Sequence, residues 1–109
     1  MLALLLALAA AAPVHDARCS STKTDDLLAC GQGALDRAEA ALNKQWRRMP
    51  HPAELVRAQK AWLVWRDAEC EAENYATGGH EEQIVRLACL ADLTDQRAKQ
   101  LRANYKWME

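Results

Sequence analysis

Apolar residues recur every three or four positions along most of the chain, and no stretch alternates between apolar and polar residues. Spacings of three and four place side chains on one face of an α-helix, whereas alternation would indicate a strand. Breaks rich in proline or glycine divide this pattern into three segments. The sequence therefore predicts an all-α fold, a small antiparallel three-helix bundle with short connections.

The first predicted helix begins after a polar lead-in, residues 18–24, and ends just before the proline break. Asp25 and Asp26 fall in its first turn, where acidic side chains favour the positive end of the helix dipole. Gly31 and Gly33 cost about 1 kcal/mol each relative to alanine, so we expect them to let another backbone come close. The predicted apolar stripe is Leu27, Ala34, Leu35, Ala38, Leu42 and Trp46.

The second predicted helix follows Pro52, which suits a first helical turn, and runs to about Tyr75. It contains two tryptophans, which carry the largest apolar surface of any side chain. We therefore expect this helix to be the buried, central helix of the bundle. Its predicted apolar stripe is Leu55, Ala58, Trp62 and Trp65.

The third predicted helix follows a glycine-containing connection. Gly78 suits the left-handed conformation that ends a helix, and Glu81 and Glu82 then open the next one. The predicted buried side of the third helix is Ile84, Leu87, Ala88, Ala91, Thr94, Ala98, Leu101 and Tyr105.

The N-terminal residues 1–12 form an uninterrupted apolar run of alanine and leucine after the first methionine. The run is too short to span a bilayer, and it matches the hydrophobic core of a secretory signal peptide, although no lysine or arginine precedes it. We assign residues 1–17 to a signal peptide, with cleavage between residues 11 and 17, and residues 18–109 to the helical domain. The protein is then expected to be periplasmic or secreted. A buried N-terminal core helix is the alternative.

Charge and motifs exclude several classes of function. The formal net charge is −1 and there is no basic run, so neither nucleic-acid binding nor a basic membrane-binding segment is predicted. His15, His51 and His80 are scattered, and the sequence has no metal-ligand spacing, phosphate-binding loop or Ser-His-Asp order. Glu71 and Glu73 fall on different helix faces and do not converge for acid–base chemistry. We therefore expect no cofactor, no metal and no enzymatic activity.

The chain has four cysteines, an even number that predicts a small bundle stapled by two disulfides. No two are spaced as C-x-x-C, which argues against a zinc ribbon or a thioredoxin-like site. Cys30 and Cys89 would lie at similar depth on two parallel helices, so we favour Cys30–Cys89 with Cys19–Cys70. The local pairing, Cys19–Cys30 with Cys70–Cys89, is the alternative.

A polar motif, Gln59, Trp62, Arg66 and Asp67 on the second helix with Arg97 on the third, is expected to be structural. The charged pair of this motif, Arg66 and Asp67, stands between the tryptophans and a cysteine in the sequence. Arg66 is therefore expected to extend beside Trp62, and Asp67 to meet Arg97 or a helix terminus. A buried inter-helix hydrogen-bond set is expected from Gln59, Asn43 and Thr94.

Acidic side chains gather at the end of the second helix and in the following loop. Acids at a helix C-terminus oppose the dipole, so they are placed against local stability. They form either a solvated face or a surface that meets a basic partner. The candidate partner-binding residues are Glu71, Glu73, His80, Glu81 and Glu82.

These residues together resemble the LprI-type lysozyme inhibitor family of bacterial envelope proteins. The most specific part of the resemblance is the run from Gln59 to Cys70, which reads Gln-x-Ala-Trp-x-x-x-Arg-Asp-x-x-Cys. Trp46 stands where the family usually has tyrosine. The weaker matches are Cys19 with Cys30, Asp36 with Leu42-Asn43, and Gly78-Gly79 with Cys89, Thr94 and Arg97.

The resemblance implies an exported binding protein that inhibits lysozyme by occluding its cleft, with the loop at residues 75–82 as the inhibitory element. Lysozyme is then the implied protein partner. No lipid-attachment cysteine is present, so no stable membrane anchor is expected. The alternative is a structural or interaction domain of the bacterial envelope without lysozyme inhibition.

Overall fold

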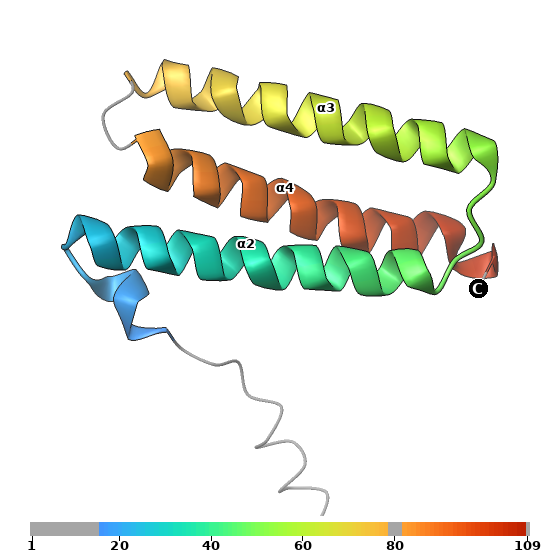
Figure 1. Ribbon diagram of the computed structural model, residues 1–109, viewed down its shortest axis with the longest axis horizontal. Helices are drawn as coiled ribbons and strands as arrows, with labels where there is room; N and C mark the ends of the chain where they lie inside the picture. Colours follow the sequence, from blue (N-terminus) through green and yellow to red (C-terminus); the bar gives the residue numbers. More distant parts are fainter. Residues whose placement is uncertain (1–15, 79–81, 109) are drawn as a thin grey trace, which may run out of the picture.

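The computed structural model describes residues 16–78 and 82–108 (Figure 1). These residues form three long helices and no strand, which confirms the predicted all-α bundle of three helices. The predicted signal peptide lies almost entirely outside the described residues. The elements are η1 (Ala17–Ser20), α2 (Thr24–Arg47), α3 (Ala53–Ala76), α4 (Glu82–Tyr105) and η2 (Lys106–Met108).

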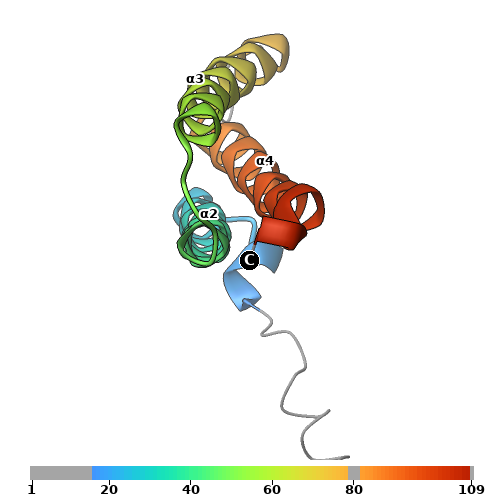
Figure 2. The same cartoon turned by 90° about the vertical axis from the view of Figure 1, so that its right-hand side faces the viewer.

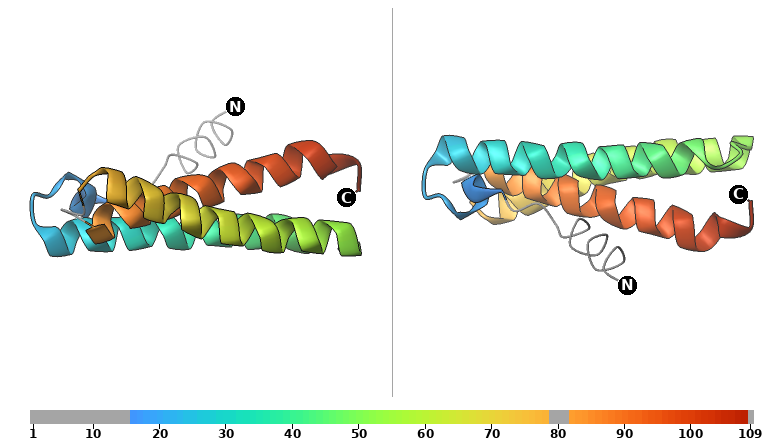
Figure 3. Two further views of the ribbon diagram at one scale, coloured as in Figure 1. Left: turned by 90° about the horizontal axis from the view of Figure 1, so that it is seen from above. Right: turned by 90° about the horizontal axis from the view of Figure 1, so that it is seen from below.

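The helix α4 lies in the middle of the bundle, with α2 on one side and α3 on the other (Figures 1 and 2). Among the described residues, the backbones of α2 and α3 do not approach each other closely. Helices α2 and α4 run parallel, α3 runs antiparallel to both, and α3 crosses α4 at an angle when seen from above (Figure 3). The prediction that the second helix is central is therefore wrong.

Two apolar clusters hold the helices together, one toward each end of α4. At one end, Leu35 of α2 packs with Leu90 and Ala91 of α4 and with the Cys70–Cys89 disulfide. At the other end the cluster includes Leu101, whose side chain is fully buried. Its buried members are Leu42, Met49, Leu55, Ala98 and Leu101.

Two glycines have the roles that the sequence predicts for them, Gly31 within α2 and Gly78 just after α3. A Cβ atom placed on Gly31 would lie 2.9 Å from the Cβ of Leu87, so the absence of a side chain there lets α4 approach α2. Gly78 follows α3 with a φ of 82°, the left-handed conformation that glycine adopts without steric cost. At Gly33 an added Cβ would meet only the side chain of Arg37, so close packing does not require that glycine.

The disulfides are Cys19–Cys30 and Cys70–Cys89, so the favoured pairing of Cys30–Cys89 with Cys19–Cys70 is wrong. The face of α4 near Gly31 presents Leu87 to α2. Cys89 follows Leu87 by two residues, a rotation of about 200° around a helix, and therefore faces α3. One bridge ties η1 to α2, and the other ties α3 to α4.

Helix α3 is more exposed than its two tryptophans suggest. Leu55 is buried and Trp62 is half-buried, but Trp65 is 49% exposed and Val64 is 72% exposed. Among the described helices the backbone of α3 comes close only to that of α4, so much of the surface of α3 stays uncovered. The predicted stripe is therefore confirmed at Leu55 and wrong at Ala58 and Trp65, which are exposed.

Candidate functional site

The predicted polar motif lies at the interface of α3 and α4. The side chain of Trp62 receives two cations: the guanidinium carbon of Arg66 lies 5.5 Å from the centre of its ring, and that of Arg97 lies 5.7 Å away. Cations at this distance from an indole face are attracted by its quadrupole. This arrangement confirms that Arg66 extends beside Trp62, and it adds Arg97 to the same ring.

Hydrogen bonds extend this cluster across the two helices. Arg66 donates from Nη1 to Oγ1 of Thr94 at 3.1 Å, and it donates from Nε and Nη2 to Oδ1 of Asp67 at 3.0 and 2.9 Å. Arg97 donates from Nε to Oε1 of Gln59 at 2.9 Å. Asp67 therefore pairs with Arg66 and not with Arg97. Gln59 and Thr94 bridge the helices as expected, whereas Asn43 is exposed on α2.

Arg97 is the buried charge of this cluster. Only 9% of the residue is exposed, and burial lowers the pKa of its guanidinium. Its acceptors are the amide oxygens of Gln59 and Gln100, and no described carboxylate pairs with it. Asp67 is the one carboxylate that pairs with Arg66, and its side chain is largely exposed. The cluster around Trp62 therefore holds two guanidinium groups and one carboxylate, an excess of positive charge.

The candidate partner-binding residues differ in what the structure shows of them: one is ion-paired, one contacts a disulfide, and the side chains of the other three lie outside the described part. Glu71 forms an ion pair of 2.9 Å with Arg86, which ties the end of α3 to the start of α4. Oε2 of Glu73 lies 3.0 Å from Sγ of Cys89, a contact rather than a hydrogen bond because a disulfide sulfur carries no proton. His80 and Glu81 lie outside the described residues. Glu82 begins α4, but its side chain also lies outside the described part.

Charge is separated along the bundle. At one end, called the acidic end here, lie the start of α2 and the end of α3 (Figure 1). The opposite, basic end holds the last turns of α2 and α4, where cations favour the negative end of the helix dipole. The described acids of the acidic end are Asp25, Asp26, Glu69, Glu71 and Glu73, which outnumber its cations Lys23 and Arg86. The cations of the basic end are Lys44, Arg47, Arg48, Lys99, Arg102 and Lys106, which outnumber its acid Glu54.

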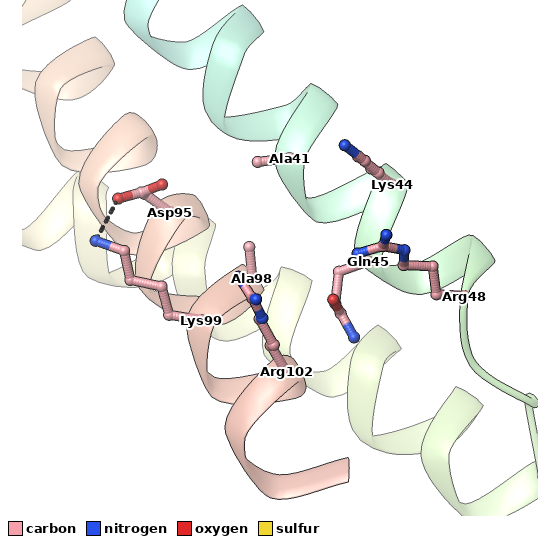
Figure 4. Close-up of a pocket in the computed structure, with 8 residues that line it drawn as sticks. All are labelled: Ala41, Lys44, Gln45, Arg48, Asp95, Ala98, Lys99 and Arg102. Atoms are coloured by element: carbon pink, nitrogen blue, oxygen red, sulfur yellow. Dashed lines mark ion pairs between the residues drawn. The ribbon is translucent and has the colours of Figure 1, made fainter. Parts of the chain in front are cut away.

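The basic end contains a groove of about 270 Å³ between α2 and α4, which the sequence analysis did not find. Figure 4 shows Lys44 and Arg48 extending from α2 and Arg102 from α4, with Lys99 held by Asp95 at 3.0 Å. In the sequence, the groove is indicated only by basic residues in the last turns of two helices. Without knowing that these helices run parallel and touch, one cannot tell that the basic residues line one groove.

Within the described ranges, no group of three or more His, Cys, Asp or Glu side chains could hold a metal ion. No helix among those same residues is long and apolar enough to cross a membrane.

Comparisons with known proteins identify what this arrangement is similar to. Residues 16–101 match the family model described as "Lysozyme inhibitor LprI". An uncharacterized protein of Rhizobium meliloti (strain 1021) is 41% identical over 49 residues, which are 44% of this chain and 35% of that relative. The match thus spans about a third of the relative's length. No solved structure gives a significant match to the chain.

Proposed function

Since the chain belongs to the LprI lysozyme inhibitor family, we propose that it is an exported protein that inhibits lysozyme by occluding the substrate cleft. The acidic end makes the contact, through the loop at residues 75–82 and the carboxylates beside it. The protein performs no chemistry of its own, because a bound side chain or loop in the cleft is enough to exclude the substrate.

The observation that carries this proposal is the separation of charge along the bundle. Residues 67–73 hold four carboxylates, Asp67, Glu69, Glu71 and Glu73, and no lysine or arginine. Glu73 falls in the last turn of α3, which contains no basic residue, so its carboxylate meets the unfavourable end of the helix dipole. Asp67 and Glu71 have cationic partners within the bundle, Arg66 and Arg86. No described cation pairs with Glu69 or Glu73, and a basic partner protein would supply one.

The net charge of −1 understates this attraction, because the basic last turns of α2 and α4 lie at the opposite end of the bundle. A basic partner that approaches the acidic end is attracted by the carboxylates near it, because charges more than about 10 Å away are screened at moderate salt. Complementary charge mainly raises the association rate and selects the partner. Inhibition is therefore expected to weaken as ionic strength rises.

The test is lysozyme-catalysed lysis of bacterial cell walls with increasing amounts of the purified, oxidised protein. We expect dose-dependent inhibition. Reversing two loop charges, Glu81→Lys with Glu82→Lys, should weaken inhibition about tenfold through slower association. The matched control, Glu39→Lys with Glu54→Lys, changes the net charge equally but lies away from the acidic end, and it should leave inhibition nearly unchanged.

Three results would count against this mechanism. Equal loss of inhibition in both double variants would assign the effect to overall charge rather than to the acidic end. Unchanged inhibition by the variant with reversed loop charges would remove the loop from the mechanism. A protein that inhibits no class of lysozyme, yet forms a stable complex with another envelope protein, would be an interaction domain that shares only the family's fold.

A further inference from the structure

A second groove lies between α3 and α4, on the side of the cation cluster. It has a volume of about 290 Å³, near the small end of the range for ligand sites and suited to one ring-sized group. Trp65 stands at this groove with half of its surface exposed. The groove is lined by Trp62, Trp65, Leu93, Gln96, Arg97 and Gln100.

Arg97 brings a buried positive charge with unused donors to this groove. A guanidinium has five N–H groups, and those of Arg97 with partners are one on Nε, to Gln59, and one on Nη1, to Gln100. In the described part of the chain, the only fully buried side-chain polar atom without a partner is Oδ1 of Asn74. Nη2 of Arg97 is therefore accessible, and it can donate to a ligand.

The missing partner of Arg97 is an anion. Arg97 lies in the middle of α4, so a helix terminus does not explain its charge, and its neighbour Arg66 already takes the nearby carboxylate of Asp67. The planar fork of a guanidinium matches the two oxygens of a carboxylate. A largely buried charge with only neutral acceptors gains from such a partner, because opposite charges attract more strongly near a protein interior than in bulk water.

The other lining groups favour a saccharide as the carrier of that carboxylate. Trp65 offers a broad, flat apolar face, on which the apolar side of a sugar ring can lie. The side-chain NH₂ of Gln100 and Oε1 of Gln96 have no partners among the described residues, so one can donate to a hydroxyl group and the other can accept from one. We propose that this groove binds a saccharide ring that carries a carboxylate.

The proposal does not depend on lysozyme inhibition, because the groove lies away from the acidic end. The experiment compares two sugars by calorimetry with the purified, oxidised protein. N-acetylmuramic acid carries a lactyl carboxylate, and N-acetylglucosamine has the same ring without it. We expect the acidic sugar to bind at least tenfold more tightly. Equal affinities, or no heat from either sugar, would overturn the proposal.

Two variants locate the binding without disturbing the buried cluster. Trp65→Ala removes the exposed ring, and Gln96→Ala removes a polar group at the rim, and each should weaken binding of N-acetylmuramic acid at least fivefold. The matched control is Trp107→Ala, which removes another exposed tryptophan, 82% accessible, at the C-terminal end. Wild-type affinity in both groove variants would show that the sugar binds elsewhere.

Arg97 itself is tested by a substitution that keeps its charge. Arg97→Lys retains a cation but loses the fork, so the preference for the acidic sugar should fall at least threefold in protein with unchanged helical circular dichroism. A preference that persists in this folded variant would remove Arg97 from recognition. An acetylated glutamate amide that competes as well as the sugar would overturn the saccharide assignment, because the groove would then recognise any carboxylate.

Discussion

The two sides of α4 are packed in different ways. Against α2, the contacts are apolar and close enough that Gly31 has no room for a side chain. Against α3, one buried apolar contact at Leu55 is joined by a disulfide, cations on the ring of Trp62 and hydrogen bonds between long polar side chains. The comparison indicates that α2 and α4 share most of the apolar core, and that α3 adds one end of its apolar face at Leu55 and is otherwise attached by specific links.

The largest expected effect comes from removing apolar volume in the buried cluster near the C-terminal end of α4. Leu101→Ala should lower the free energy of unfolding by about 3–4 kcal/mol, because it leaves a cavity where the side chain is fully buried. Urea denaturation followed by circular dichroism measures this loss. Leu63→Ala is the matched control on α3, where the side chain is 39% exposed, and it should cost only about 1 kcal/mol. Equal losses would contradict the comparison.

The next largest effect is expected from removing the disulfide that links α3 to α4. Replacing Cys70 and Cys89 by alanine opens a loop of 19 residues, which in the chain-entropy account costs about 3 kcal/mol. We expect amide hydrogen exchange to accelerate throughout α3 and to change little in α2. The double alanine variant of Cys19 and Cys30 is the control, since it should release only η1. Uniform acceleration over all helices in the first variant would mean that α3 belongs to the same folding unit.

The sequence predicted those features that depend on neighbouring residues. Helical spacing placed the three helices, and the left-handed conformation of Gly78 follows from residue type alone. The disulfide partners could not be predicted in this way, because they depend on which face α4 turns toward each neighbour. Leu87, rather than Cys89, faces α2, and only the packing at Gly31 reveals this.

The central helix was also mispredicted, for a related reason. Two tryptophans suggested burial of the second helix, but Trp62 is large enough to be half-covered by one neighbour and two arginines. Helix α4 presents smaller side chains, such as Ala91 and Ala98, and can be covered from both sides. The groove with Arg97 was missed because its residues come from two helices whose relative rotation the pattern does not fix.

A smaller effect tests the polar links of α3. Arg66→Ala removes the hydrogen bond to the buried hydroxyl of Thr94 and the contact with Trp62, so it should cost about 1–2 kcal/mol. Asp67→Ala removes only a largely exposed ion pair with the same arginine and should cost at most about 0.5 kcal/mol. Denaturation of both variants measures the difference. Equal losses would mean that the surface pair, and not the link to α4, holds α3.

The smallest effect sharpens the comparison on the α2 side, through two glycines in one helix. Gly33→Ala should stabilise the protein by about 0.5–1 kcal/mol, since alanine favours a helix and the added methyl meets only the flexible side chain of Arg37, 3.4 Å away. Gly31→Ala brings the same gain in helix propensity, but its methyl would lie 2.9 Å from the Cβ of Leu87. That atom cannot move without shifting α4, so this variant should be destabilised by about 1 kcal/mol despite the better helix former. Opposite signs in thermal denaturation would establish that α2 and α4 touch at backbone distance. Stabilisation by both substitutions would show that α4 can retreat from α2 at little cost, and the close packing would then not be what distinguishes this side of the bundle.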